Sequence, residues 1–306
     1  MRAYLLLMLV VVFYAGNILT GKALSELPPL TIAFGRIAVA FLVLLPIGYR
    51  SAWRSRHLFI RHWKPLLLMT VTGVAGFNTL IYSALQFTSA TNVSVLEASI
   101  PAVTVLLGFW LLRERLRPLQ WAGVLLSLCG AVWVVTNGQL LRLTEMSWNA
   151  GDAIMAIGAL SWAVYSIAVR RYLPLFPAHG TVLVMTGLSV LFMLPLLLAE
   201  WAVVGIPPIS GGQWSGLLYL GIFPSVIALL LYNRAVATLG ASQASVFLNF
   251  VPVFTMLGAY VLLGEAISLM QILGAVAVIL GVFFTTRSRR VLVRSEECPA
   301  VTVEES

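Results

Sequence analysis

Two ionisable side chains lie inside stretches of the sequence that are otherwise almost entirely apolar. Glu97, in VLEASIP, is the seventh residue of an apolar run from 91 to 112, and Arg36 is the seventh residue of the run from 30 to 49. An acidic group in the middle of a membrane helix costs roughly 2.5–3.5 kcal/mol unless it is solvated, paired or protonated. Such a group marks a functional site, so Glu97 is the first candidate functional residue.

Three roles for Glu97 are consistent with its position. Its carboxyl group could couple transport to protons, bind a cationic or amino group of a substrate, or form a structural salt bridge. Arg36 and Glu97 are each the seventh residue of their apolar run. Arg36 is therefore the candidate partner for a structural ion pair. The sequence leaves the three roles open.

The composition places both residues in a membrane. Of the 306 residues, 60% are hydrophobic and 10% are charged, and the mean hydropathy of +0.97 is far above that of a water-soluble protein. Segments that approach the ~20 residues needed to span a bilayer as a helix are 3–23, 30–49, 65–86, 91–112, 118–136, 150–170, 179–199, 214–233, 241–263 and 268–286. We predict an all-α integral membrane protein with ten transmembrane helices.

The basic residues predict the orientation of these helices. If both termini are cytoplasmic, 16 of the 19 Lys and Arg residues fall at cytoplasmic helix ends and only Lys22 and Arg142 fall in outer loops. An excess of Lys and Arg in cytoplasmic loops is the usual topology signal. The pattern predicts a multi-pass protein of the cell inner membrane. Although Arg2 precedes the first apolar run, as in a signal peptide, we interpret that run as a retained helix.

Several classes of function are disfavoured by the sequence. The net charge of +8 is accounted for by helix ends, so we expect no binding of nucleic acid. Cys129 lies in an apolar segment and Cys298 in the C-terminal tail, which provides neither a disulfide framework nor a cysteine metal site. Catalytic and phosphate-binding motifs are absent from the sequence. We expect no enzymatic activity, no cofactor and no bound metal.

The sequence also repeats itself. At a constant shift of 151 residues, Pro101 matches Pro252, Thr104 matches Thr255, and Gly123 matches Gly274. Five apolar segments lie in each copy, and an odd number makes the two copies enter the membrane from opposite sides. We predict two inverted five-helix repeats, at 5–136 and 150–286, followed by a cytoplasmic tail at 287–306 whose composition does not favour a packed core.

Three stretches carry a resemblance to a known family. They are GNILTGKALSELPPLTIAFGRIAVAFLVLLP, ALQFTSATNVSVLEASIPAVTVLLGFWLLRERLRPLQWAGVLL and the second copy of the latter. The chain resembles the drug/metabolite transporter superfamily and, within it, the ten-helix EamA-type exporters, whose better-known members export amino acids and related metabolites. An arginine in the second helix looks like a feature of this family, so Arg36 is assigned mainly to fold maintenance. The acid at 97 departs from the family pattern.

Polar and aromatic residues within the apolar segments are the candidates for lining a central cavity. Helical spacing puts several of them on matching faces of segments 91–112 and 241–263, and the alternatives for the others are helix packing and interfacial anchoring. The candidate substrate-binding residues are Tyr14, Asn17, Asn78, Tyr82, Ser94, Glu97, Trp162, Tyr165, Tyr232, Ser245 and Asn249.

Two prolines are the candidate gates or hinges. Pro101 and Pro252 match between the repeats, and a proline inside a helix kinks it and frees a backbone carbonyl group. The alternative is a purely architectural bend. By contrast, small residues at similar spacing in 118–136 and 268–286 predict close packing of these two segments against other helices, away from substrate.

The sequence thus predicts a secondary-active or facilitative transporter that exports amino acids or related small metabolites by alternating access. Its partners would be a small-molecule substrate and the lipid bilayer, with proton coupling as one alternative and a monomeric or homodimeric state left open. A multidrug or sugar-derivative carrier is the alternative within the same superfamily. A membrane scaffold or sensor that transports nothing is the alternative from another class.

Overall fold

The computed structural model describes residues 2–87, 93, 96–112, 117–136, 138, 150–263 and 268–287. Within these residues the regular secondary structure is helical and no strand occurs, which confirms the all-α class. The predicted tail beyond residue 287 lies outside the described part.

The helices of the N-terminal part alternate between long and interrupted elements. They are α1 (Arg2–Ala23), α2 (Pro29–Arg54), α3 (Arg56–Arg61), α4 (Trp63–Met69), η1 (Thr70–Gly76), α5 (Phe77–Phe87), α7 (Ile100–Leu111) and α8 (Pro118–Thr136). The C-terminal part follows a similar order. Its elements are α10 (Ala150–Tyr172), η2 (Leu173–Leu175), α11 (Ala178–Val204), α12 (Gly211–Ile222), η3 (Phe223–Ala228), α13 (Leu229–Leu239), α14 (Ala241–Val246), η4 (Phe247–Phe250), α15 (Val251–Leu263) and α16 (Leu269–Arg287).

Seven helical segments are long and apolar enough to cross a membrane. These are Ala3–Ala23, Pro29–Arg54, Trp63–Phe87, Ala150–Leu175, Ala178–Val204, Gly211–Leu239 and Ala241–Gly258. Shorter apolar helices at Ile100–Leu111, Pro118–Gly130 and Ile272–Thr285 lie in three further predicted segments. Seven such helices are typical of a multi-pass membrane protein, whereas the count of ten spans stays a prediction.

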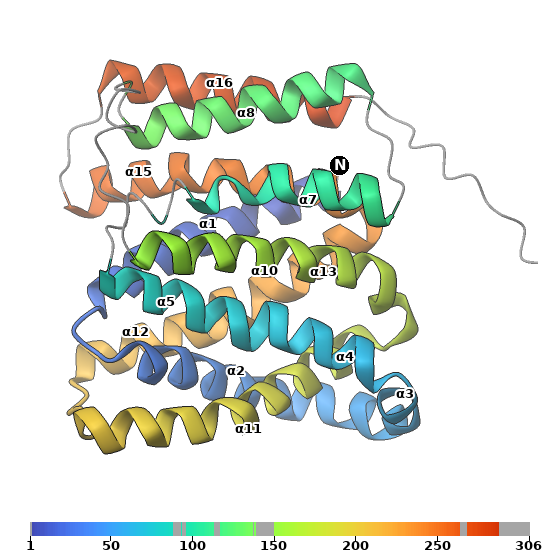
Figure 1. Ribbon diagram of the computed structural model, residues 1–306, viewed down its shortest axis with the longest axis vertical. Coiled ribbons are helices and arrows are strands. Elements are labelled where there is room, and N and C mark those ends of the chain that lie inside the picture. The colour runs from blue at the N-terminus through green and yellow to red at the C-terminus, as the bar shows by residue number, and fades with distance from the viewer. Residues whose placement is uncertain are drawn as a thin grey trace, which may run out of the picture.

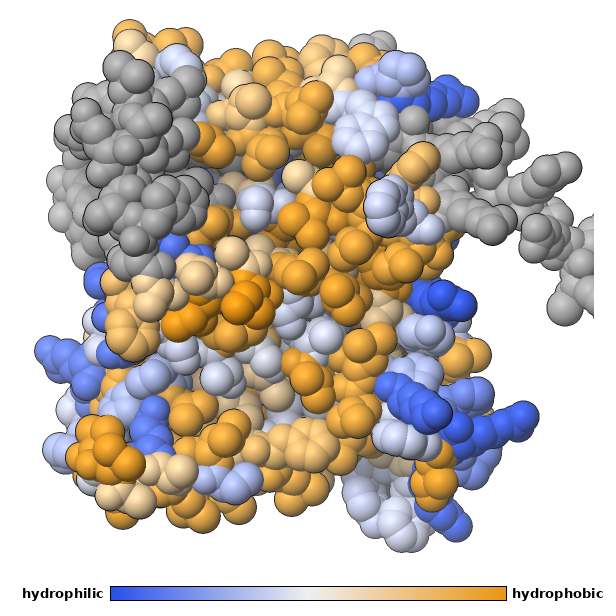
Figure 2. Space-filling model, viewed as in Figure 1, coloured by the Kyte–Doolittle hydropathy of each residue, from blue (hydrophilic) through white to orange (hydrophobic). Residues whose placement is uncertain are grey.

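The helices form a layered bundle in which two close helix pairs lie at opposite ends. In Figure 1, α8 and α16 lie side by side at the top, α2 and α11 at the bottom, and the other long helices between them. Figure 2 shows hydrophobic side chains over the middle of the visible face and hydrophilic side chains near the two sides where the helices end. This distribution is expected for helices surrounded by lipid along their middle.

The contact between α8 and α16 is made by backbone against backbone. A Cβ atom at Gly123 would lie 2.6 Å from the carbonyl oxygen of Gly281, and one at Gly130 would lie 2.7 Å from the amide nitrogen of Val278. Small residues permit such close approach of membrane helices. The prediction that these two segments pack closely through their small faces is confirmed.

We expect Gly281→Ala to destabilise the protein by about 1–3 kcal/mol, because overpacking a tight contact forces backbone shifts. The added methyl group would press on the amide nitrogen of Ser127 and lie 2.7 Å from the carbonyl oxygen of Gly123. Thermal unfolding in detergent measures the change. Gly212→Ala is the matched control, since a Cβ there meets nothing within 4 Å. Equal unfolding midpoints for the two variants would contradict the assigned contact.

At the other end of the bundle, a carboxylate group ties α11 to the start of α2. Glu200 accepts hydrogen bonds of 3.0 Å from the backbone amides of Leu30 and Thr31 and from the Thr31 hydroxyl group. The indole nitrogen of Trp201 donates to the same hydroxyl at 3.0 Å. The first amides of a helix have no partner within it, so Glu200 supplies the cap that α2 lacks locally.

Four helices depart from regular α geometry near the centre of the bundle. The π-helical segments η1 and η3 interrupt Trp63–Phe87 and Gly211–Leu239, and such segments often occur at functional sites. Pro101 lies in the first turn of α7, just after the turn at 98–99, and Pro252 lies in the first turn of α15, after the 3₁₀ segment η4. Neither proline lies inside a continuous α-helix, where the sequence had placed them.

The reason is the geometry of helix starts. The first amides of a helix have no acceptor within it, so a proline there forfeits no hydrogen bond. The α-helical elements α7 and α15 each begin one residue before the proline. A role of these two prolines in gating stays a prediction.

Candidate functional site

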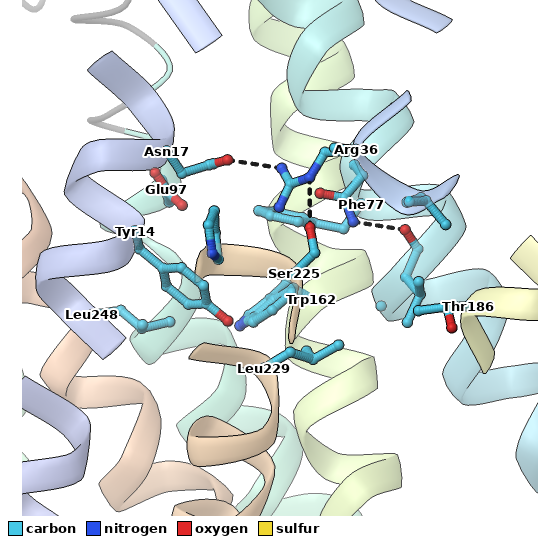
Figure 3. Close-up of a pocket in the computed structure, with 15 residues that line it drawn as sticks. Tyr14, Asn17, Arg36, Phe77, Glu97, Trp162, Thr186, Ser225, Leu229 and Leu248 are labelled. Atoms are coloured by element: carbon cyan, nitrogen blue, oxygen red, sulfur yellow. Dashed lines mark hydrogen bonds between the residues drawn. The ribbon is translucent and has the colours of Figure 1, made fainter. Parts of the chain in front are cut away.

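A pocket lies where helices from both predicted repeats meet (Figure 3). It is close to the interrupted helices, since η1 and η3 each contribute two residues to its wall. The lining residues are Tyr14, Asn17, Arg36, Ile37, Gly73, Val74, Phe77, Asn78, Glu97, Trp162, Thr186, Pro224, Ser225, Leu229 and Leu248.

Several lining residues occupy matching positions in the two predicted repeats. At shifts that rise from 148 to 151 residues along the chain, the matched lining pairs are Tyr14 and Trp162, Ile37 and Thr186, Val74 and Pro224, and Glu97 and Leu248. A pocket lined in this way is expected at the interface between the two predicted repeats, where transporters built from inverted repeats bind substrate.

Arg36 is held by three neutral side chains. Its Nε donates to Ser225 Oγ at 2.9 Å, and its Nη1 donates to Asn17 Oδ1 at 2.8 Å and to the Tyr82 hydroxyl group. The Arg36 side chain is only 3% exposed, and it connects α1, α2, α5 and η3. Buried charges need such hydrogen bonds, so this network supports the predicted role of Arg36 in maintaining the fold.

The Arg36 network uses only part of the guanidinium group. Nη2 makes no hydrogen bond in the part of the chain that the structure describes, and Arg36 lines the pocket. The partners of Arg36 also bind one another or the backbone, since Tyr82 Oη donates to Asn17 Oδ1 at 2.9 Å and Ser225 Oγ donates to the Leu220 carbonyl at 2.7 Å. One edge of the guanidinium group is therefore available to a ligand.

The Glu97 carboxyl group lies in the same pocket without a partner. Its Oε2 is enclosed and makes no hydrogen bond, and no ion pair joins Glu97 to Arg36, although both residues belong to the described part of the chain. In Figure 3, Glu97 lies near Asn17, whereas the dashed bonds of Arg36 lead to Asn17 and Ser225. An enclosed carboxyl oxygen without a partner is costly, which points to a ligand or a proton at this place.

Aromatic rings from four helices surround Trp162. Its ring centroid is 4.6 Å from that of Phe77, 5.2 Å from that of Tyr165, 5.5 Å from that of Tyr232 and 5.8 Å from that of Tyr14, which it meets edge to face. The hydroxyl group of Tyr14 and the indole nitrogen of Trp162 are enclosed and make no hydrogen bond among the described residues. Aromatic walls with few polar groups are typical of small-molecule sites.

Two hydrogen bonds connect α10 to α13 beside the pocket. Tyr165 Oη donates to Asn233 Oδ1 at 2.6 Å, and the hydroxyl groups of Ser166 and Tyr232 are 2.8 Å apart. Tyr165 and Tyr232 are fully buried and do not line the pocket, so they support the Trp162 ring from behind.

The structure thus divides the residues that the sequence singled out. Lining the pocket are Tyr14, Asn17, Asn78, Glu97, Trp162 and Arg36. Tyr82, Tyr165 and Tyr232 are bonded just behind its wall. Ser245 and Asn249 are not among the lining residues of this pocket. Ser245 donates to the Ser242 carbonyl at 3.0 Å, and Asn249 donates to Ser127 Oγ at 2.9 Å. Ser94 lies outside the described residues.

Other lining residues escaped the sequence reasoning. They are mostly apolar or small, among them Gly73, Phe77 and Leu229, and such residue types do not stand out in a membrane helix. Leu248 could have been found, because it is the residue 151 positions after Glu97. Ser225 carried no signal, since a single serine in a membrane helix is more often bonded to its own backbone.

Fold, composition and pocket indicate a multi-pass membrane protein with an internal cavity, and known proteins of similar sequence make the class a transporter. The sequence model of the EamA-like transporter family matches residues 1–136 and again residues 149–287. The chain belongs to the EamA-like transporter family, within the drug/metabolite transporter superfamily.

Relatives of similar length agree with this assignment. An uncharacterized transporter of Bacillus subtilis, YyaM, is 28% identical over 83% of each chain, and one of Archaeoglobus fulgidus is 28% identical over 93% of this chain and 97% of its own. A probable terminal-alkyne amino-acid exporter of Streptantibioticus cattleyicolor is 28% identical over 90% of this chain and 87% of its own. A crystal structure with 21% identity superposes with a TM-score of 0.75 over 94% of this chain and 99% of the other.

Proposed function

We propose that this protein exports amino acids or related small metabolites across the cell inner membrane by alternating access. Its two five-helix units, 5–136 and 150–286, would have inverted orientations, with both termini cytoplasmic. The proposal is carried by the pocket whose lining includes matched positions of the two units. Transporters built from inverted repeats bind substrate at such an interface and exchange which face is open.

The packing between helices supports the two-unit arrangement. Contacts of α1 with α13 and α15 have counterparts in contacts of α10 with α5 and α7, as expected if the two units are related by an approximate twofold axis. The pairs α2 with α11 and α8 with α16 each join equivalent helices of the two units. An arrangement of this kind offers two nearly equivalent gates, one on each side of the pocket.

The polar groups in the pocket favour a substrate with an amino group. Glu97 provides a carboxyl oxygen without a partner, and carboxyl groups pair with ammonium groups. The name of the Streptantibioticus relative, a probable amino-acid exporter, agrees with that chemistry. A neutral sugar derivative has no ammonium group to pair with the Glu97 carboxyl group, so we rank a carrier of such compounds second.

Counterflow in proteoliposomes tests the proposal. Purified protein is reconstituted with unlabelled amino acid inside, and uptake of labelled amino acid is followed against a panel of amino acids, sugars and drug-like cations. We expect transient accumulation of at least one amino acid above empty vesicles. Accumulation of sugars or drug-like cations alone would favour the other carrier classes, and the absence of flux for the whole panel would favour a scaffold or sensor.

A further inference from the structure

The ionisable groups of the pocket come from one unit only. Arg36 and Glu97 lie in the unit at 5–136, whereas the position that matches Glu97 in the other unit is Leu248 and the one that matches Arg36, at a shift of 149 residues, is Met185. Leu248 lines the pocket as Glu97 does. The two units therefore contribute matching positions to the pocket wall but different kinds of side chain.

The wall provided by the unit at 150–286 is largely apolar. Pro224, Leu229 and Leu248 have no polar side-chain atom. The hydroxyl groups of Thr186 and Ser225 donate hydrogen bonds to backbone carbonyl groups. Trp162 presents an aromatic ring with a single indole N–H group. A charged group of a ligand would find no counter-charge on this side, whereas an apolar group would meet apolar side chains.

Two opposite charges are available on the other side. The Glu97 carboxyl group has no partner, and Nη2 of Arg36 has none in the described part of the chain, while Asn17 holds Nη1 in place. The two groups form no ion pair with each other, so each can bind a ligand group of the opposite charge. A ligand that carries both an ammonium and a carboxylate group would satisfy both.

We infer that the substrate is zwitterionic and binds in one orientation. Its ammonium group lies at Glu97, its carboxylate group lies at Arg36, and its apolar side group lies against the wall formed by Pro224, Leu229, Leu248 and Trp162. This inference rests on the proposed function and makes it narrower: compounds that lack either charge are poor substrates, and Arg36 is a binding residue in addition to its part in the fold.

Three compounds of similar size test the need for both charges. They are L-leucine, its decarboxylated amine 3-methylbutylamine and its deaminated acid 4-methylpentanoate, each used as a competitor of labelled leucine counterflow and as a ligand in calorimetric titration of the purified protein. We expect the amine and the acid to be at least about 100-fold weaker than leucine, because a site with paired polar groups strongly rejects an analogue that leaves one unpaired.

Two variants separate the two charges. Arg36→Met carries the residue found at the matching position, and it leaves no polar partner orphaned, because Asn17 remains bonded to Tyr82 and Ser225 remains bonded to Leu220. We expect Arg36→Met to abolish the preference for leucine over the amine, and Glu97→Gln to abolish the preference for leucine over the acid. A structural role of Arg36 alone would lower the affinity for all three compounds alike.

The exchange Glu97→Leu with Leu248→Glu tests the orientation. If the substrate binds in one orientation, the exchange fails to restore leucine transport, because the acid then faces Arg36 from the wrong side of the pocket. Restored transport would overturn the single orientation. Equal affinity of the wild-type protein for all three compounds would overturn the inference of a zwitterionic substrate while leaving the proposed transport function intact. If none of the three compounds binds or shows counterflow, both the inference and the proposed amino-acid transport are wrong.

Discussion

Glu97→Gln is expected to reduce amino-acid counterflow by on the order of 100-fold. In the proposed complex the Glu97 carboxylate pairs with the ammonium group of the substrate, and truncating one partner of a buried charge pair costs about 2–5 kcal/mol. The fold should tolerate the change. The Glu97 carboxyl group makes no hydrogen bond among the described residues, so the amide removes no internal contact and avoids the cost of an isolated acid in a membrane protein. We expect an unchanged or higher unfolding temperature in detergent together with the loss of counterflow in proteoliposomes.

Glu26→Gln is the matched control for this prediction. Glu26 lies exposed between α1 and α2, so the same substitution there should leave both measurements unchanged. A Glu97→Gln variant that lost stability but retained flux would reveal a structural role. Proteoliposomes with the wild-type protein also test proton coupling. A flux that does not change when a pH gradient is imposed would exclude coupling through Glu97.

Gly73→Ala is expected to lower both the stability and the transport rate. A Cβ atom at Gly73 would lie 2.5 Å from Cε2 and Cγ of Tyr165, and that ring has nowhere to move, because it is fully buried, packed on Trp162 and bonded to Asn233. Overpacking a core contact costs about 1–3 kcal/mol. The displaced ring would also disturb Trp162 in the pocket wall, so counterflow should fall with the unfolding midpoint.

Gly158→Ala provides the comparison for Gly73. Gly158 is a helical glycine of α10, and a Cβ there would have its nearest neighbour, Leu80 Cβ, at 3.5 Å, an ordinary van der Waals contact. We expect this variant to match the wild type or to be slightly more stable, since alanine is the better helix former. Equal losses in the two variants would contradict the clash with Tyr165 as the cause, because a Cβ at Gly158 meets only ordinary contacts.

The sequence predicted the location of the pocket better than its wall. Glu97 and Arg36 stood out because a charge inside an apolar segment is costly, and Tyr14, Asn17, Asn78 and Trp162 followed from their polarity; all six line the pocket. The partners of Arg36 could not be predicted, since Ser225 is 189 residues away and such contacts depend on the tertiary packing. Apolar lining residues gave no signal that distinguished them from residues facing lipid.

Asn249 shows why helical spacing was insufficient. The expectation assumed a continuous α-helix from Ser245 to Pro252, with a rotation of 100° per residue. The structure has a 3₁₀ segment at Phe247–Phe250, with three residues per turn instead of 3.6. Asn249 is consequently bonded to Ser127 in α8, and Leu248 lines the pocket. The constant shift of 151 residues would have identified Leu248, because it requires no assumption about helix type, but the sequence analysis named Asn249 instead.

The matched positions of Glu97 and Leu248 bear on how such a chain can evolve. A homodimer of identical five-helix proteins would place the same residue on both sides of its central site, so an acid on one side would face an equal acid on the other, and their repulsion would oppose binding of a single ammonium group. A fused duplicate is free of that constraint. Each copy can mutate separately, and one gene can encode an acid in one half and a leucine in the other, as this chain does.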